Sequence, residues 1–351
     1  ALSDKQVLRQ CRNVSVDTIW GGTLGGPVVK NHTFFFTSYD NNPFRTTLGS
    51  VTRAALGAPS RALLQANRNN FASPAAVDFV LNNFPVSNDP TPAAGTIAAS
   101  QVVVRNAAGN PVTGNAATST ITFLTFNRFQ GAGVPYGTDF WRWLGKLNTK
   151  INSNDQLSFR YLIDKATDNG QPASLPGLEV GSLSKNDSFT INDVYVINSS
   201  FINEARFTYS RRKIDFPDNF AQFANGAQIS IAGANGAFNG GNANFPQNRD
   251  DHVMEFTENI GYTKGNHAMK FGYNGLRYDL NSFFAPNSRG FISYSSMNNF
   301  LNDVSNGVQL ANGEFRVRPI TWEHSFFAQD DWRVNPDLTL NLGLRYEYVT
   351  T

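Results

Sequence analysis

Hydrophobic and polar residues alternate with a period of two in several stretches of the chain. The clearest stretch runs from Leu338 to Tyr348, where Leu or Tyr occupies every second position and polar or small residues occupy the positions between. The same alternation occurs in 157–163 and 204–210. Because successive side chains of a strand point to opposite faces, the pattern predicts strands with one apolar and one polar face.

Short polar segments join these strands in pairs. Residues that favour tight hairpin turns occur in 30–32, 152–155, 198–200, 264–266 and 335–337. With these turns, the pattern predicts about ten antiparallel strands. They cover 16–28, 33–42, 140–151, 156–165, 188–198, 201–212, 252–263, 267–280, 320–333 and 338–349.

Long connections alternate with the tight turns. They span about 43–139, 166–187, 213–251 and 281–319 and are rich in Asn, Gly, Pro, Ala and Ser. Bacterial outer-membrane barrels have tight periplasmic turns and long extracellular loops, whereas neither end of a soluble β-sandwich is privileged in this way. We therefore expect an all-β fold: a fragment of an antiparallel up-and-down transmembrane β-barrel with long extracellular loops.

The longest connection, about 43–139, is expected to contain local structure, because bare loops of that length are rare. Ser73 is placed to cap a short helix that runs to Phe84. Segments 102–105 and 121–126 read as short strands, and 297–301 in the last long loop reads as a helical turn.

Composition supports a polar surface that is neutral rather than ionic. The chain has 351 residues, only 16% of them charged, and a net charge of +2, so no global field points to a nucleic-acid partner. It has no apolar run of roughly 18 residues, so a membrane role would use strands. Cys11 is the only cysteine, which excludes an internal disulfide.

Aromatic residues gather near the ends of the expected strands. In a barrel they would form girdles at the two membrane interfaces, although core packing of a soluble β-protein explains them as well. The girdle candidates are Phe35, Tyr39, Trp141, Tyr161, Tyr209, Tyr273, Trp322, Trp332 and Tyr348.

The polar positions of the alternating strands would face a barrel lumen. Their charged members could contact a plug or a passing substrate, or they could simply form solvated wall. These lumen-lining candidates are Arg160, Glu204, Arg206, Arg345 and Glu347. Substrate selection is expected in the long loops, which project outward and tolerate variation.

Motifs of catalysis, metal binding and cofactor binding are missing from the sequence. The four histidines have no metal-binding spacing, and the Gly-rich stretch 21–26 lacks the context of a phosphate loop, so its glycines fit a bent or closely packed strand. Asp330 and Asp331 would point to opposite faces of a strand, and no nucleophile elbow occurs. We expect no enzyme activity, no cofactor and no resident metal. Four acidic residues expected in loops remain weak calcium candidates, namely Asp187, Asp218, Asp250 and Asp251.

Two stretches resemble a known family. Residues 20–36, WGGTLGGPVVKNHTFFF, resemble the early barrel hairpin of Oar-like TonB-dependent receptors. Residues 325–348, SFFAQDDWRVNPDLTLNLGLRYEY, resemble the mid-barrel hairpin of TonB-dependent receptors generally. The resemblance implies a barrel of about 22 strands around an N-terminal plug, of which residues 1–351 would supply under half, without the plug and the remaining strands.

That resemblance also implies a function and a location. The whole protein would be a receptor in the outer membrane of a Gram-negative bacterium, contact outer-membrane lipid, and take up a bulky nutrient with energy from the TonB–ExbB–ExbD complex, which acts through the plug. A passive porin shares the loop pattern but needs no plug. A secreted soluble β-protein that binds glycans or surfaces is the third reading.

Overall fold

A computed structural model describes most of the chain. The described residues are 15–48, 52–71, 73–83, 86–87, 126–130, 134–171, 180–216, 226–232, 243–295 and 297–350.

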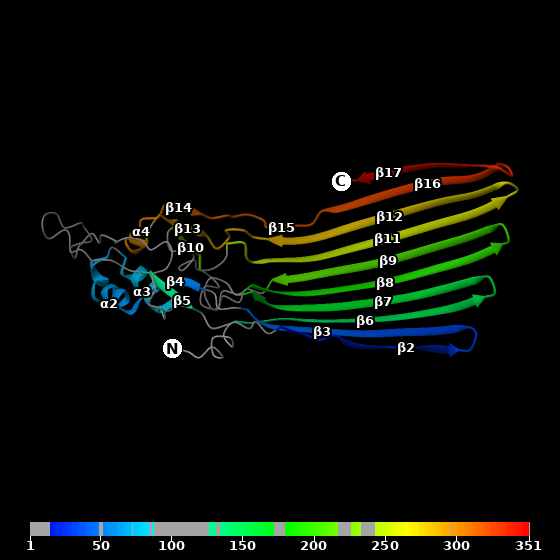
Figure 1. The fold of residues 1–351 in the computed structure, drawn as a ribbon. Helices are drawn as coiled ribbons and strands as arrows, with labels where there is room; N and C mark the ends of the chain where they lie inside the picture. Colours follow the sequence, from blue (N-terminus) through cyan, green and yellow to red (C-terminus); the bar gives the residue numbers. More distant parts are fainter. Residues whose placement is uncertain are drawn as a thin grey trace.

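A single twelve-stranded antiparallel sheet dominates the structure (Figure 1). We call it the wall, and its main strands are β1 (Ser15–Asp17), β2 (Trp20–Val29), β3 (Thr33–Leu48), β6 (Val134–Asn152), β7 (Asp155–Gln171), β8 (Val180–Asn198), β9 (Phe201–Phe216), β11 (Gln247–Lys264), β12 (His267–Phe284), β16 (Ile320–Asn335) and β17 (Leu338–Thr350).

The strands of the wall follow one another in chain order. β1 and β2 both pair with β3, along different parts of its length, and the short β15 (Arg316–Val317) pairs with β12 beyond the start of β16. The wall is therefore ten strands wide, from β1 and β2 to β17, and these two borders are not paired with each other. The barrel is open in this structure.

The predicted strands are confirmed, except that the first, 16–28, is divided into β1 and β2, and most of them run several residues further at the end of the long connections. β8, for example, begins at Val180 rather than 188, and β3 ends at Leu48 rather than 42. The insertion expected at about 43–139 is correspondingly shorter. These extensions carry polar residues on both faces, so the alternation that reveals a strand is weak there.

The tight turns are also confirmed, and asparagine side chains stabilise several of them. Asn152 Oδ1 accepts a hydrogen bond from the amide of Asn154 at 2.8 Å. Asn198 and Asn335 accept the same bond from the amides two residues on, each at 2.9 Å. This is the local side-chain bond that makes Asn favourable in turns.

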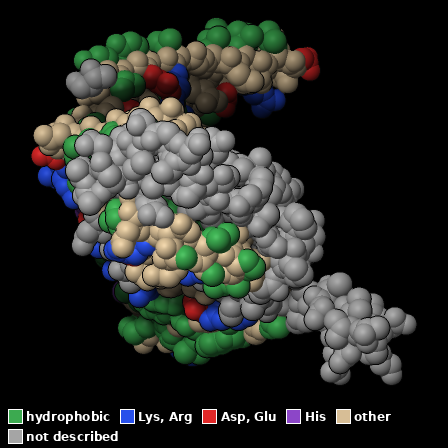
Figure 2. Space-filling view, turned by 90° about the vertical axis from the view of Figure 1, so that its left-hand side faces the viewer, with side chains coloured by type: hydrophobic (Ala, Val, Ile, Leu, Met, Phe, Trp, Pro, Cys, Tyr) green, Lys and Arg blue, Asp and Glu red, His purple; other side chains and the backbone are tan. Residues whose placement is uncertain are grey.

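The register of the strands sorts side chains onto two faces. Ala328 lies opposite Leu344, and Phe326 lies opposite both Tyr346 and Tyr273. We call the face that carries these residues the apolar face, and the opposite one the polar face. In the view onto the loop end, hydrophobic side chains lie along the outer side of the uppermost strands (Figure 2).

The Gly-rich β2 packs closely against β3, as expected. A Cβ atom at Gly21 would lie 2.3 Å from the carbonyl oxygen of Tyr39, and one at Gly25 would lie 3.2 Å from that of Phe35. Glycine at position 21 is therefore required by the close approach of the neighbouring backbone.

The long connections form a second layer at one end of the wall (Figure 1). We call this layer the loop cap. It contains β4 (Thr52–Leu56), α2 (Ala58–Ala66), η1 (Arg68–Asn70), α3 (Pro74–Asn83), β5 (Phe126–Gln130), β10 (Gln228–Ile231), β13 (Phe291–Tyr294), α4 (Met297–Leu301) and β14 (Gly307–Gln309). Among the described residues, no helix is long and apolar enough to cross a membrane.

The helices expected at 73–84 and 297–301 are confirmed as α3 and α4. Ser73 caps α3, since its Oγ accepts a hydrogen bond from the amide of Ala76 at 3.2 Å. α2 was not predicted, because 58–66 carries few large apolar residues. The strand expected at 102–105 lies outside the described residues, and so does that at 121–126 except for Phe126, the first residue of β5.

The buried hydrophobic core of the described residues lies in the loop cap rather than in the wall. Leu56, Leu64, Val77, Val80 and Leu301 are at most 1% exposed. By contrast, Leu344 on the apolar face of the wall is 76% exposed. The wall is one sheet thick, so its large apolar residues have no second protein layer to cover them.

Two connections that are far apart in the sequence share this core. The ring of Phe79 in α3 packs edge-on against Phe300 in α4, with centroids 6.1 Å apart, and Phe300 packs in the same way against Tyr294 at 5.0 Å. The amide of Ser73 also donates a hydrogen bond to the carbonyl of Leu301 at 3.3 Å. The cap is therefore a packed unit that joins the β3–β6 and β12–β16 connections.

Leu301→Ala in the complete protein should loosen this unit. Removal of a fully buried leucine side chain costs about 2–5 kcal/mol of stability. Here that cost should lower the free energy of local opening of the cap. Hydrogen exchange should accelerate in α3 and α4 and stay unchanged in the wall. Leu310→Ala is the matched control, because Leu310 lies in the same connection but is 70% exposed. Equal effects of the two variants would contradict a shared core.

An ion pair ties η1 to α3. Arg68 donates hydrogen bonds to Asp78, from Nε to Oδ1 at 2.6 Å and from Nη2 to Oδ2 at 2.5 Å. These bonds lower the pKa of the Asp78 carboxyl below its ordinary value. The pair therefore stabilises the cap above the unfolded pKa of about 4, and this contribution is lost as the pH falls through the lower, folded pKa.

A pH titration of exchange protection in α3 tests this contribution. Between pH 6 and pH 3, the protection factors of α3, corrected for intrinsic exchange rates, should fall more in the wild type than in Asp78→Asn, which lacks the titrating carboxyl. If both proteins lose protection equally, the ion pair has no part in holding η1 against α3.

Candidate functional site

The five charged residues predicted to line a lumen all lie on the polar face of the wall. On β7, Arg160 is directly opposite Thr190 of β8, and on β9, Arg206 is opposite Asn192 and Thr257. Glu204 precedes Arg206 by two residues and lies on the same face. On β17, Arg345 donates a hydrogen bond from Nε to Glu347 Oε1 at 2.6 Å.

These five residues are spread over the wall rather than gathered in one site. Glu204 and Arg206 are neighbours on β9, and Arg160 lies two strands away. Arg345 and Glu347 lie on β17, with β11, β12 and β16 between them and β9. Their shared face is as expected, and a lumen-lining role stays a prediction.

The nine girdle candidates all lie on the apolar face, and several pack against other aromatic rings across strands. Tyr39 packs against Trp20 and Trp141, with ring centroids 5.5 and 6.4 Å apart. Trp143 packs against Tyr161 at 6.0 Å. The register places Phe35, Tyr209, Tyr273, Trp322, Trp332 and Tyr348 on the same face.

Aromatic contacts occur both near the tight turns and further toward the cap. Trp332 stacks on His267 at 5.4 Å, and Phe201 packs against Tyr262 at 6.0 Å, each close to a turn. Tyr273 packs against Phe326 at 4.9 Å, further from the turns. The arrangement fits aromatic rings at two levels, and the girdle itself stays a prediction.

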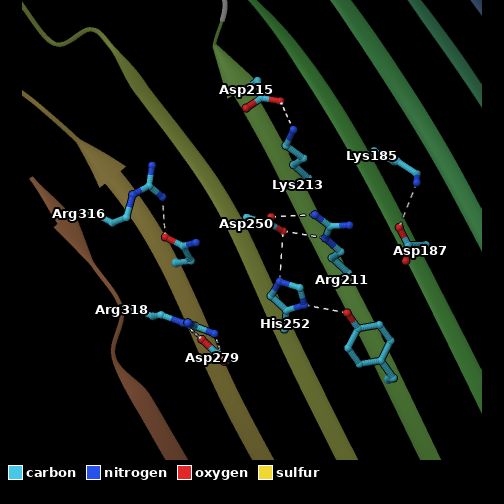
Figure 3. Close-up of polar contacts among 12 residues, drawn as sticks. Lys185, Asp187, Arg211, Lys213, Asp215, Asp250, His252, Asp279, Arg316 and Arg318 are labelled. Carbon is cyan, nitrogen blue, oxygen red and sulfur yellow. Dashed lines mark hydrogen bonds and ion pairs between the residues drawn. The ribbon is translucent and has the colours of Figure 1, made fainter.

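A group of charged residues, which the sequence did not reveal, lies on the apolar face at the cap end of the strands (Figure 3). Arg211 of β9 donates two hydrogen bonds to Asp250 of β11, both at 2.8 Å. His252 Nε2 lies 3.4 Å from Asp250 Oδ1, and its Nδ1 is hydrogen-bonded to the hydroxyl of Tyr209 at 2.7 Å. We call this group the charged band; by register it comprises Lys165, Lys185, Asp187, Arg211, Lys213, Asp215, Asp250, His252, Arg277 and Asp279.

Asp279 of β12 is the most enclosed carboxylate of the charged band. Its side chain is 6% exposed and accepts two hydrogen bonds from Arg318, at 2.7 and 2.8 Å, and a third from Arg277 at 3.3 Å. The guanidinium of Arg277 also lies 5.7 Å from the ring centre of Trp322. Bidentate bonds of this kind fix the position of Arg318 just before β16.

The weak calcium candidates were placed wrongly. Asp187 lies in β8, and Asp250 and Asp251 lie in β11, because these strands extend beyond the predicted boundaries. Asp250 and Asp251 also point to opposite faces. Asp218 lies outside the described residues. Within the described part of the chain, no three His, Cys, Asp or Glu side chains are grouped so as to hold a metal ion.

Asp330 and Asp331 do point to opposite faces, as predicted. Asp330 lies on the apolar face near a turn, where its Oδ2 is 2.7 Å from Nδ1 of His267. Asp331 lies on the polar face and accepts a hydrogen bond from Gln329 at 3.2 Å. The two carboxylates cannot cooperate in acid–base chemistry.

A family model described as an outer membrane beta barrel domain matches residues 9–351. The chain belongs to this outer membrane beta-barrel family. Among curated proteins, none matches the sequence significantly.

The solved structure of one outer-membrane transporter has a similar fold. The outer membrane transporter YddB from Escherichia coli covers 95% of this chain with a TM-score of 0.50 and 9% sequence identity. The copper transporter OprC covers 95% with a TM-score of 0.37 and 10% identity. This chain spans 34% and 36% of the lengths of those two chains, about a third in each case.

Membership of the family locates the protein in the outer membrane of a Gram-negative bacterium. In such barrels the outward face of each strand meets lipid and the inward face meets the lumen. The apolar face of this wall is accordingly the one suited to lipid, and the polar face is the one suited to water.

Phe207→Arg tests this orientation in the complete protein. Phe207 lies near the middle of β9 on the apolar face, where arginine should cost about 2–4 kcal/mol against lipid. Thr208→Arg, one residue on and on the polar face, is the matched control and should change stability little. The folded fraction is measured by heat-modifiable migration in gel electrophoresis. The stability is measured by urea unfolding in lipid vesicles. A larger loss in Thr208→Arg would reverse the assignment of the faces.

Proposed function

We propose that this chain forms part of the barrel wall of a TonB-dependent receptor that takes up a bulky nutrient. The observation that carries the proposal is the hairpin of β16 and β17. Its sequence resembles the mid-barrel hairpin of those receptors, and it ends at a wall border that has no partner strand. A strand border that meets lipid must be paired, because lipid cannot satisfy free backbone groups.

The ten-stranded width supports a large barrel. Further strands would have to join the two borders, and a wide barrel leaves a lumen that needs a plug if it is not to be a permanent pore. The likeness in fold to the outer membrane transporter YddB, of which this chain spans about a third, is consistent with that size.

In this proposal the two faces and the cap have different tasks. The polar face, with Arg160, Glu204 and Arg206, lines the passage and contacts the plug or the moving substrate. The loop cap forms the outward surface on which a nutrient first binds, since loops on a rigid scaffold are the usual place of recognition. Energy reaches the plug through the TonB–ExbB–ExbD complex. We propose transport without enzyme activity.

Conductance in planar bilayers separates this function from that of a passive porin. The complete protein, purified in detergent and reconstituted, should show no steady open-channel current, because the plug closes the lumen. A permanently open pore, by contrast, gives a stable conductance step for each inserted molecule. Such steps from the unmodified protein would contradict the proposal and support the porin.

Nutrient depletion tests the energy coupling. Cells of a Gram-negative host that produce the complete protein are incubated with a mixture of peptides and oligosaccharides too large for porins. Depletion of at least one component should require both the protein and a functional TonB. Depletion that is equal in a strain without TonB would contradict energy-dependent uptake.

A further inference from the structure

Three lysines of the charged band lie side by side on adjacent strands. Lys165 of β7 is directly opposite Lys185 of β8, and Lys185 is directly opposite Lys213 of β9. We call these three residues the lysine row. Since neighbouring strands lie about 5 Å apart, the three Cα atoms fall within about 10 Å. Like charges directly opposite each other destabilise a sheet, so pairing of the strands does not explain the row.

The acidic residues nearby neutralise the lysine row only in part. Lys185 Nζ lies 3.6 Å from Asp187, and Lys213 Nζ lies 3.1 Å from Asp215, with both lysine side chains nearly half exposed. Asp250, opposite Lys213, is held by two hydrogen bonds from Arg211 (Figure 3). Lys165 is exposed and has no ion pair within the described part of the chain. The row therefore keeps an excess of positive charge.

The position of the lysine row along the strands places it at the outer edge of the lipid-facing band of the barrel. Lys213 is twelve residues beyond Phe201, the first residue of β9 after its tight turn. At about 3.3 Å per residue and a tilt of about 40°, this corresponds to roughly 30 Å above the turn. The lipid-facing band of a barrel is about 25 Å tall. The row thus lies at the level of the outer headgroups rather than among acyl chains.

Aromatic residues border the lysine row, one beside it at the same level and two on the side of the turns. Trp141 lies directly opposite Lys165, and Tyr161 and Tyr209 lie four residues nearer the turns on β7 and β9. Aromatic rings favour the zone between acyl chains and headgroups. Outward-facing cations just beyond such rings are positioned to meet the anionic part of a lipid.

We propose that the lysine row binds a phosphate group of the phosphorylated glycolipid of the outer leaflet. Three ammonium groups can surround a phosphate from one side, and Lys is a common phosphate ligand because it acts as a point charge with three donors. The bound phosphate removes the repulsion between the three lysines. The lipid so held lies against the outside of the wall, next to β7, β8 and β9 and below the loop cap.

The complete protein in a non-ionic detergent is titrated with bis-phosphorylated lipid A, and binding is measured by native mass spectrometry. The variant Lys165→Gln/Lys185→Gln/Lys213→Gln should bind it about tenfold more weakly or worse, as the loss of three surface cations predicts. The matched control is Lys146→Gln/Arg212→Gln/Arg249→Gln, which removes the same charge from the polar face of β6, β9 and β11. It should bind within about twofold of the wild type. Dephosphorylated lipid A should not distinguish the wild type from the lysine-row variant.

Several results would overturn the proposal. Wild-type affinity in the lysine-row variant, an equal loss in the polar-face control, or equally tight wild-type binding of dephosphorylated lipid A would each do so. Binding of inorganic phosphate alone at the same concentrations would assign the row to free phosphate instead of lipid. Heat-modifiable migration checks folding. If the triple variant does not fold, Lys185→Gln should weaken binding while Lys185→Arg retains it, and equal binding by the two would refute the assignment.

Discussion

Backbone hydrogen bonding between neighbouring strands is the constraint on which the rest of this structure depends. Lipid offers no partner to a free N–H or C=O group, so a chain that crosses it as strands must pair every strand with the next. The ladder runs without interruption from β1 and β2 to β17. Because successive side chains along a strand point to opposite faces, the register of the ladder also decides which side chains face lipid and which face water.

The wall and the loop cap are stabilised in different ways. The wall has no buried hydrophobic core of its own in the described residues, since its apolar residues are left for lipid to cover. The cap behaves like a small soluble domain, with Leu64, Val80 and Leu301 fully buried. It joins two connections that begin on distant strands, and it therefore gives the outward end of the barrel a defined shape. The lysine row lies at the end of the wall that is next to the loop cap.

The sequence predicted the wall well because alternation and turn chemistry are local. Ten strands, their order, the tight turns and the face of every named aromatic and lumen residue followed from counting positions. The charged band did not follow, because it depends on register at the far ends of the strands. Lys185, Lys213 and Asp250 lie beyond the predicted strand boundaries, where polar residues on both faces hide the alternation, so their partners could not be counted from the sequence.

The loop cap was predictable only in fragments, for a different reason. α3 has a serine cap and regular apolar spacing, both of which are local signals. α2 has no side-chain cap, and Leu64 is its one large side chain that is buried within the cap. The contact of α3 with α4 joins residues more than 200 positions apart, which no short-range pattern encodes.

The most direct test of the account is an accessibility scan along 203–212 of β9. Cys11 is replaced by serine, single cysteines are introduced in the complete protein, and a spin label at each is exposed in lipid vesicles to oxygen and to a water-soluble nickel complex. The account predicts a period of two, with labels at 203, 205 and 207 accessible to oxygen and those at 204, 206 and 208 accessible to nickel. Uniform accessibility, or the opposite phase, would contradict it.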